Sequence, residues 1–280
     1  MKIIDGRALA AEIRARTAER ISTSGQTPKL AVLLVGDDAA SHLYVSLKEK
    51  AAKEVGVATD IQRLPATTSD DELVQLIETW NADDSINGIL IQLPLPEGHD
   101  ETRIVAAMDP KKDADGFHPK NIENLLSGKG TIISPVHEGI LRLIAATDVV
   151  PNGATAALIV NSDVFAKPLA YLLEKAGSRV TTTSADDLDK KAVATAQIVV
   201  IAIGRANYLQ RGMFSSNTCI IDVGTNKLDN GKTVGDVDVS SLEDVPGWLS
   251  PVPGGVGPMT IALLLKNVTD LTLSPSPSSP

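Results

Sequence analysis

The sequence contains a single cysteine, Cys219, so no disulfide can form within the 280-residue chain. A lone cysteine suits a reducing compartment, and the apolar neighbours Ile220 and Ile221 predict a buried structural thiol. Basic residues are also few: 26 Lys and Arg face 35 Asp and Glu, a formal net charge of −9. Because nucleic-acid binding needs a basic surface, we expect no nucleic-acid partner.

Long apolar runs are missing as well. No segment approaches the roughly 18 apolar residues of a membrane-spanning helix, and residues 1–6 lack the apolar core of a secretion signal. We therefore expect a cytoplasmic protein with no membrane partner. No metal site is expected, because the histidines lack partners at ligand spacing; they are His42, His99, His118 and His137. The Ser/Pro-rich segment 272–280 is predicted to be a disordered tail.

Helical and strand patterns alternate in the first part of the chain. Apolar residues recur at helical spacing over 8–21, 41–55 and 70–81, whereas 29–35 and 86–93 are short apolar runs. Short buried strands that alternate with helices are typical of a parallel sheet covered on both faces. The first part is therefore predicted to be an α/β domain.

A second alternating series begins near residue 154. Apolar strands are predicted at 156–160, 180–183, 197–203 and 218–223, with a helix over 164–176 between the first two. This order indicates a Rossmann-type nucleotide domain.

The fold expected is thus α/β with two domains. The first spans 1–118 and is completed by a C-terminal helix over 258–271, and the second spans 119–257. The segment 109–139 between them is polar and punctuated by Pro and Gly. Because ligand sites favour clefts between domains, we expect the active site there.

Four short segments carry the chemistry. Ser250–Thr260 holds three glycines and three prolines, which predicts a rigid loop that feeds a helix and lets a ligand approach the backbone. Tyr44 and Lys48 lie four residues apart on one helix face, an arrangement common on any helix surface. Gln92 closes an apolar strand and must find hydrogen-bond partners. Lys112–Gly116 places two acids in a tight loop, which alone is also typical of a solvated turn.

Together these segments resemble the bifunctional methylenetetrahydrofolate dehydrogenase/methenyltetrahydrofolate cyclohydrolase family. The family pattern Y-x-x-x-K corresponds to Tyr44 and Lys48, and Q-L-P-L-P corresponds to Gln92–Pro96. K-D-V-D-G corresponds to Lys112–Gly116, with alanine in place of valine. P-V-P-G-G-V-G-P-M-T corresponds to Pro251–Thr260.

The resemblance implies a tetrahydrofolate substrate, an NADP cofactor and a homodimer. It assigns hydrolysis of the methenyl group to Lys48 as base, oriented by Gln92 and Tyr44, and it assigns the pterin N–H groups to Asp115. The substrate-binding positions it implies are Tyr44, Lys48, Gln92, Leu93, Asp115, Pro253, Gly254 and Gly255. The cofactor-binding positions it implies are Val160, Asn161, Ser162, Ser184 and Thr225.

The sequence departs from the family at the cofactor positions. The family carries G-[RA]-S-x-x-V-G-x-P after its strand, whereas this chain reads V-N-S-D-V-F-A-K-P from Val160. A β-branched residue at the first glycine position is expected to be strained at positive φ. Asn161 lacks an arginine's charge, and Asp163 is expected to cap the helix itself and to repel a phosphate.

Two further departures follow. Asp186 and Asp187 oppose a 2′-phosphate, although an acid at this strand end can accept a hydrogen bond from the ribose 2′-hydroxyl of NAD. The segment Ser134–Gly139 also replaces the family's P-C-T-P-x-G and brings in His137. These departures affect positions expected to bind the nucleotide and leave the residues expected to carry out hydrolysis unchanged. We therefore expect a cyclohydrolase whose dehydrogenase activity is weak or absent.

Two alternatives remain open at this point. In the first, the protein is fully bifunctional and uses NADP or NAD through a remodelled loop, with compensating charge from Lys167 and Arg179. In the second, it is a non-catalytic folate-binding relative. The presence of both Lys48 and Gln92 speaks against the second alternative, because a binding protein has no evident use for that pair.

Overall fold

The computed structural model describes residues 1–130 and 132–273, and its contacts divide the chain into two units, named here by their sheets. The three-stranded unit comprises Ala11–Pro135 and the described residues from Ile261 onward. The six-stranded unit comprises Met1–Ala10 and Val136–Thr260. The α/β organisation expected from the sequence is confirmed. The contacts place the division of the chain after Pro135, whereas the sequence placed it after residue 118.

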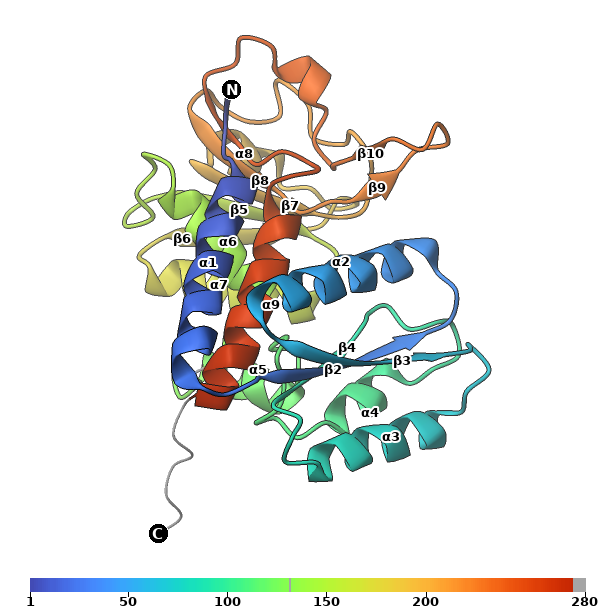
Figure 1. Cartoon of the computed structure of the whole chain (residues 1–280). Helices are drawn as coiled ribbons and strands as arrows, with labels where there is room; N and C mark the ends of the chain where they lie inside the picture. The colour runs from blue at the N-terminus through green and yellow to red at the C-terminus, as the bar shows by residue number, and fades with distance from the viewer. Residues whose placement is uncertain (131, 274–280) are drawn as a thin grey trace. The chain divides into compact units, whose positions relative to one another are not determined.

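The three-stranded unit is built on a parallel sheet in the order β3-β2-β4. Helix α2 covers one face of this sheet, and α3 with α4 covers the other (Figure 1). The strands are β2 (Lys29–Val35), β3 (Ala58–Leu64) and β4 (Gly88–Ile91). The helices are α2 (Ala39–Val55), α3 (Asp70–Ala82), α4 (Glu101–Ala106) and α5 (Pro119–Leu126), together with most of α1 (Gly6–Ser24) and α9 (Val256–Leu273).

Strand β2 shows why this unit forms two cores. Leu30, Val32 and Leu34 pack against residues of α2 and α9, while Leu33 and Val35 pack against α3 and α4. Successive side chains of a strand point to opposite faces, so a strand covered on both sides is apolar throughout. Helices α1 and α9 also lie side by side, and Arg20 donates to Asp270 at 2.7 Å.

The helix ends follow from local sequence. The side chain of Asp38 accepts a hydrogen bond from the Ser41 N–H at the start of α2. The helix stops at Gly56, whose φ of 91° is a left-handed conformation that favours glycine. Helix α3 begins with a capping box formed by Ser69 and Glu72.

The six-stranded unit contains a parallel sheet in the order β1-β11-β8-β7-β5-β6. The chain passes from β5 to β6 on one side and then to β7 on the other, so the strand order reverses at β5. In open α/β sheets, ligands bind outside the carboxyl ends of the strands at such a reversal. The strands are β1 (Lys2–Ile3), β5 (Thr155–Val160), β6 (Arg179–Thr183), β7 (Ile198–Ala202), β8 (Thr218–Asp222) and β11 (Gly247–Leu249). The other elements are α6 (Pro135–Ala145), α7 (Asp163–Lys175), α8 (Lys190–Thr195), the hairpin β9 (Asn226–Lys227) and β10 (Thr233–Val234), and the 3-10 turn η1 (Val239–Leu242).

The helices and strands predicted from apolar periodicity are all present. The segment 109–139, which the sequence presents as a polar connection, contains α5 and the start of α6. The predicted helix over 258–271 is longer, because α9 begins directly after Gly255 and continues to Leu273. Residues 272 and 273 of the predicted tail therefore belong to this helix, and 274–280 lie outside the described residues.

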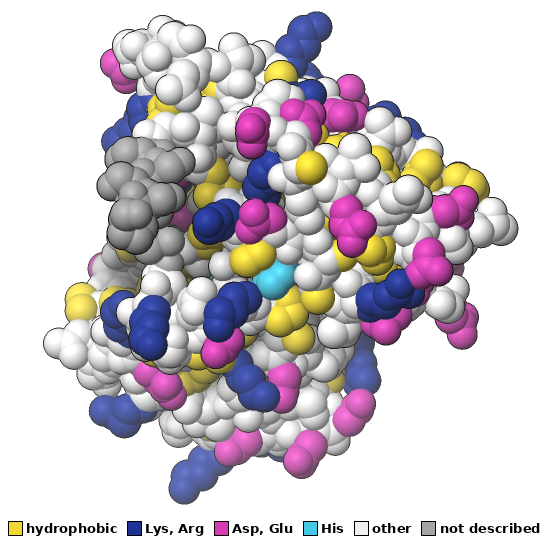
Figure 2. Space-filling view, turned by 90° about the horizontal axis from the view of Figure 1, so that it is seen from below, with side chains coloured by type: hydrophobic (Ala, Val, Ile, Leu, Met, Phe, Trp, Pro, Cys, Tyr) yellow, Lys and Arg dark blue, Asp and Glu magenta, His cyan; other side chains and the backbone are white. Residues whose placement is uncertain are grey.

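The surface carries charges of both signs. On the face shown in Figure 2, basic and acidic side chains are interspersed and apolar atoms form small scattered groups. Within 1–130 and 132–273, no helix is both long and apolar enough to cross a membrane.

Lys112 ties the loop after α4 to the end of α3. Its Nζ donates to the backbone carbonyls of Trp80, Asn81 and Asp83 at 2.9, 2.8 and 2.8 Å. The last carbonyls of a helix have no partner within the helix and carry the negative end of its dipole. A half-buried ammonium group that satisfies them holds two segments of the three-stranded unit together.

Replacing Lys112 should therefore destabilise the protein. Lys112→Met keeps the apolar stem and removes all three donors, and hydrogen bonds to charged groups contribute about 1.5–3 kcal/mol. We expect a loss of about 2 kcal/mol in the free energy of unfolding, measured by urea titration. The exposed neighbour Lys111→Met should stay within about 0.5 kcal/mol of the unchanged protein. Equal midpoints for the two variants would show that the three hydrogen bonds contribute nothing.

Candidate active site

Lys48 and Gln92 meet in the three-stranded unit. Lys48 lies on α2 and Gln92 follows β4, and Nζ of Lys48 donates to Oε1 of Gln92 at 2.9 Å. The amide nitrogen of Gln92 donates to the carbonyl of Leu93 at 2.8 Å. Because that bond fixes which end of the amide is the nitrogen, Oε1 is the atom turned toward the lysine. Gln92 thus finds the partners that its place at the end of an apolar strand requires.

The acidic loop after α4 is organised by Asp113. This fully buried carboxylate accepts hydrogen bonds from the backbone N–H groups of Asp115, Gly116 and His118 at 3.2, 2.8 and 2.9 Å. It also accepts one from the side chain of Asn121 at 2.9 Å. The sequence presented the loop either as a solvated turn or as a ligand site. The structure shows a buried turn in which Asp113 holds the backbone and leaves the Asp115 side chain outside this network.

Lys48 and Asp115 influence each other's ionisation. Burial lowers the pKa of Lys48, and the charge of Asp115 partly opposes that shift. Burial raises the pKa of Asp115 to about 6, with Lys48 acting to lower it and Asp113 to raise it. The site therefore holds an amine that loses its proton more readily than usual beside a carboxyl group that ionises near neutral pH.

Tyr44 and Leu93 flank this pair. Tyr44 is half-buried one turn before Lys48 on α2, and none of the described residues forms a hydrogen bond with its hydroxyl group. The side chain of Leu93 packs against the core on the α3 face of the sheet. Only its carbonyl takes part in the arrangement, as the acceptor for Gln92.

The loop that carries Pro253, Gly254 and Gly255 lies in the six-stranded unit. Gly254 has a φ of 122°, a conformation that side chains disfavour, and the N–H of Gly255 donates to the carbonyl of Pro251 at 2.7 Å. A Cβ placed on Gly6 would lie 2.2 Å from the Gly255 carbonyl oxygen, so backbone packs directly on backbone here. The expectation of a tight loop that leads into a helix is confirmed.

A cavity of about 780 Å³ lies at the carboxyl ends of β5 and β6. Four predicted cofactor positions line it: Val160, Asn161, Ser162 and Ser184. The start of α7 forms one wall, and the N-cap residue Ser162 makes no side-chain hydrogen bond to the helix. Helix N–H groups that no side chain caps are suited to an anion such as a pyrophosphate. The place and walls of the cavity therefore fit a dinucleotide.

Two arguments against nucleotide binding prove wrong. Val160 is the last residue of β5 and is not among the residues with positive φ, so the strain expected at the first glycine position does not arise. Asp163 does not cap α7 within the described structure; its carboxylate instead pairs with Lys167 at 2.8 Å. That pairing also offsets part of the repulsion expected between Asp163 and a phosphate.

The other residues expected to contribute to the cofactor site do not line the cavity. Thr225 follows β8 at the carboxyl edge of the sheet but does not line the cavity. Arg179 is the first residue of β6 and lies at the amino end of that strand, whereas the cavity lies at its carboxyl end. The compensating role expected of Arg179 is therefore not supported. Lys167 is paired with Asp163. Sequence reasoning missed Arg205, whose guanidinium donates to Asp186 at 2.7 Å.

Two buried acids that the sequence analysis overlooked hold the loops at this edge. Asp236 accepts hydrogen bonds from the N–H groups of Ile203, Gly204 and Arg205 at 2.7, 3.1 and 2.8 Å. Asp222 accepts three more, from Gly224, Asp236 and Val237, each at 3.0 Å. Burial raises the pKa of Asp222 to about 7. A usable signal was present in the sequence for Asp222, which closes an apolar stretch and is followed two residues later by Gly224. Asp236 directly follows Gly235 but closes no apolar stretch.

Two other residues noted in the sequence are buried away from solvent. His137 packs on Phe165 with ring centroids 4.9 Å apart, and burial lowers the pKa of His137 to about 4, so the ring is neutral at pH 7. Burial raises the pKa of Cys219 to about 12, as expected of a structural thiol.

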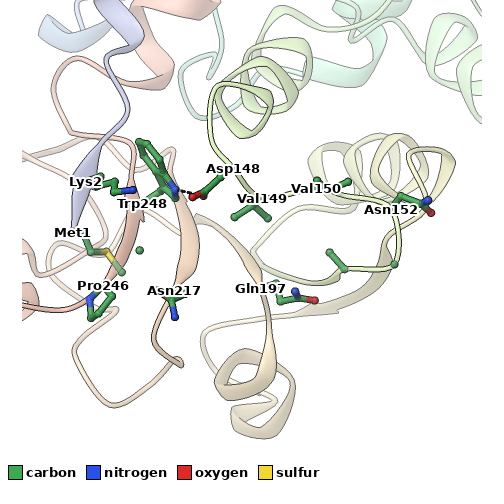
Figure 3. Close-up of a pocket in the computed structure, with 13 residues that line it drawn as sticks. Met1, Lys2, Asp148, Val149, Val150, Asn152, Gln197, Asn217, Pro246 and Trp248 are labelled. Carbon is green, nitrogen blue, oxygen red and sulfur yellow. Dashed lines mark hydrogen bonds between the residues drawn. The ribbon is translucent and has the colours of Figure 1, made fainter.

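A second cavity, of about 710 Å³, lies at the amino ends of the strands of the same sheet (Figure 3). Residues before β5, β7 and β8 line it, and the indole N–H of Trp248 donates to Asp148 at 2.6 Å. Lys2 lies over the indole ring, 4.8 Å from its centroid. None of the predicted site residues lines this cavity.

Comparison with known proteins covers both units. Residues 4–115 match the profile of the tetrahydrofolate dehydrogenase/cyclohydrolase catalytic domain. Residues 134–274 match the profile of the NAD(P)-binding domain of the same family. The two matches therefore take in most of the chain.

Individual relatives agree with the two profiles. The bifunctional protein FolD of Lactiplantibacillus plantarum is 45% identical over 276 residues, which cover 96% of each chain. That of Campylobacter fetus is 44% identical over 271 residues, covering 95% of this chain and 96% of the relative. The crystal structure of bifunctional FolD from Campylobacter jejuni superposes with a TM-score of 0.92 at 36% identity, over 97% of this chain and 98% of the other. The structure of the Trypanosoma brucei enzyme, solved with NADP and an inhibitor, superposes with a TM-score of 0.90 at 29% identity over 97% of each chain. With these matches and the geometry above, the chain belongs to the tetrahydrofolate dehydrogenase/cyclohydrolase family.

Proposed function

We propose that this protein is a bifunctional one-carbon folate enzyme. In this proposal it oxidises methylenetetrahydrofolate with a nicotinamide nucleotide and hydrolyses the methenyl product to 10-formyltetrahydrofolate. The observation that carries the proposal is the hydrogen bond from the half-buried Lys48 amine to Gln92, with Asp115 near enough to influence the pKa of Lys48. Relatives named bifunctional, at 42–45% identity over nearly the whole chain, support both activities.

The hydrolytic step needs a base. The methenyl group is a cation with an electron-poor carbon, and water that attacks this carbon must lose a proton. Lys48 meets the requirement because burial favours its neutral amine, which has a lone pair to accept that proton. Gln92 accepts one hydrogen of the amine, which limits the lone pair to the two remaining directions. Tyr44, one turn away, is the further group that we assign to orienting the lysine.

Asp115 and the glycine loop are assigned to the substrate. A carboxylate is an acceptor, so Asp115 suits the N–H groups of a pterin ring. Its place is fixed by the backbone bonds to Asp113. Leu93, Pro253, Gly254 and Gly255 complete the proposed folate contacts. The absence of a side chain at Gly254 and Gly255 permits close approach of a flat ring.

The oxidative step needs a nucleotide beside the substrate and no protein base. When bound, a nicotinamide nucleotide supplies the hydride acceptor. Ser162 and the open N-terminus of α7 would hold its pyrophosphate, with Asn161, Val160 and Ser184 along the same cavity. We favour a working dehydrogenase over a lost one because Val160 is unstrained and Asp163 is paired with Lys167. As the family resemblance implies, we also propose a cytoplasmic homodimer.

The first test concerns Lys48. Lys48→Met should lower the cyclohydrolase rate at least a hundredfold, because general-base catalysis typically contributes about 10²–10⁴-fold. Lys48→Arg should fail similarly, since a guanidinium cannot accept a proton near neutral pH. The rate is measured as loss of methenyltetrahydrofolate absorbance. The exposed Lys50→Met on the same helix is the matched control, and Lys48 would have no part in the chemistry if both methionine variants hydrolysed equally fast.

The pH dependence gives an independent test. The charge of Asp115 raises the pKa of Lys48, so Asp115→Asn should lower that pKa further. More neutral amine is then present at a given pH, and the rising limb of the kcat–pH profile should move to lower pH. The KM for folate should rise in the same variant. Asp84→Asn removes one exposed charge from the same unit and should leave the limb in place; an unmoved limb in Asp115→Asn would mean that the limb does not report Lys48.

The oxidative half is tested by turnover with either nucleotide. We expect rates of roughly 1–1000 per second with NAD or NADP. Ser162→Glu places a carboxylate against the proposed pyrophosphate site and should reduce kcat/KM for the nucleotide at least tenfold, while cyclohydrolase activity continues and reports an intact fold. Ser216→Glu, exposed in the same unit but outside the cavity, is the control. Absence of turnover with both nucleotides in the unchanged protein would favour a cyclohydrolase without dehydrogenase activity.

A further inference from the structure

One end of the nucleotide cavity is strongly acidic. Thr183 ends β6, and the residues that follow it, Ser184 and Asp186–Asp189, line the cavity on that side. None of the described lining residues is a lysine or an arginine. The end of the second strand of a Rossmann unit is where the adenosine ribose of a dinucleotide is recognised.

Asp186 occupies the key position at this end. One of its carboxylate oxygens, Oδ1, accepts a hydrogen bond from Arg205 at 2.7 Å. The second oxygen remains available as an acceptor, because an ionised carboxylate has about four lone-pair sites. Asp187 adds a second exposed negative charge directly after it. The Asp189 carboxylate already accepts a hydrogen bond from the Ala192 N–H at the start of α8.

Arg205 is set in place by the buried acid behind it. Its backbone N–H donates to Asp236 at 2.8 Å, and the preceding Ile203 and Gly204 donate to the same carboxylate. The guanidinium therefore extends from a backbone that cannot shift without leaving a buried charge unsatisfied. Its ion pair with Asp186 is exposed, with side chains 46% and 81% accessible, so the pair itself can change partners easily.

We propose that this cavity selects NAD over NADP, and that Asp186 makes the selection. The second carboxylate oxygen of Asp186 accepts a hydrogen bond from the adenosine 2′-hydroxyl of NAD. The 2′-phosphate of NADP would instead place a dianion beside Asp186 and Asp187. Turning Arg205 toward that phosphate would leave the Asp186 carboxylate unpaired next to it. The inference rests on the proposed dehydrogenase function and adds its coenzyme.

The proposal implies that Arg205 can bind the 2′-phosphate of NADP once Asp186 is removed. With Asp186 removed, its guanidinium has lost its partner but keeps its backbone anchor at Asp236. Arginine binds phosphate through paired N–H groups with geometric specificity. A single substitution at Asp186 should therefore reverse the preference rather than merely weaken it.

The test is isothermal calorimetry of NAD⁺ and NADP⁺ against the full-length chain. In the unchanged protein NAD⁺ should bind at least tenfold more tightly than NADP⁺. In Asp186→Ser, NADP⁺ should tighten at least tenfold and NAD⁺ should weaken severalfold. Adding Arg205→Ala to that variant should remove the gain in NADP⁺ affinity. A gain that survives Arg205→Ala would overturn the role given to the arginine.

A matched control separates recognition from general charge. Asp163→Ser removes one negative charge from the opposite end of the same cavity, by the α7 N-terminus. It should tighten both nucleotides by a similar factor, because both carry the pyrophosphate. If Asp186→Ser also tightens both equally, the selection by Asp186 is disproved. Thermal unfolding of each variant checks that the fold is kept.

The failure of this inference is distinguishable from failure of the proposed function. Equal or tighter binding of NADP⁺ by the unchanged protein would overturn the NAD preference and leave the bifunctional enzyme standing. Binding of neither nucleotide by a protein that still hydrolyses methenyltetrahydrofolate would remove the dehydrogenase function, and the coenzyme preference with it.

Discussion

Buried carboxylates that each collect several backbone N–H groups hold the loops on which both proposed activities depend. Asp113 does this for the loop that presents Asp115, and Asp236 does it for the loop that presents Arg205. An ionised carboxylate is a pure acceptor, so it satisfies several donors that turn backbone away from regular pairing. Breaking one such set would leave a buried charge without partners, which costs several kcal/mol. The loops are therefore fixed in shape although they lie outside the strands of both sheets.

The chemistry proposed for Lys48 follows from the nature of its partner. Gln92 is neutral, so it orients the amine without strongly stabilising the ammonium form. A carboxylate in that position would hold the proton on the lysine and would work against its use as a base. The only described acid that shifts the pKa of Lys48 is Asp115, whose own pKa of about 6 lets it lose part of its charge near neutrality. Desolvation of the lysine lowers stability, and the surrounding strand and helix packing offsets that cost.

Much of the fold follows from patterns that the sequence displays openly. Strands such as β2 are apolar throughout because both faces are covered, and they are easily predicted. Strand β3 was missed because it lies at the sheet edge and its exposed side carries polar residues. The meeting of Lys48 and Gln92 could be anticipated only from motif resemblance, since 44 residues separate them. Backbone angles at Val160 and the partners of Asp163 and Asp113 depend on tertiary contacts, which no local pattern specifies.

The contrast between Asp236 and Asp186 bears on how such an enzyme changes over generations. Asp236 is fully buried and its carboxylate accepts hydrogen bonds from four groups, so almost any replacement would disrupt the fold. Asp186 is 81% exposed and can be replaced with little effect on packing. The residue to which we assign the coenzyme choice is thus among the least constrained by folding, while the scaffold behind it is among the most constrained. If Asp186 sets the coenzyme, a lineage with this architecture is one surface substitution away from exchanging electrons with a different cellular nucleotide pool.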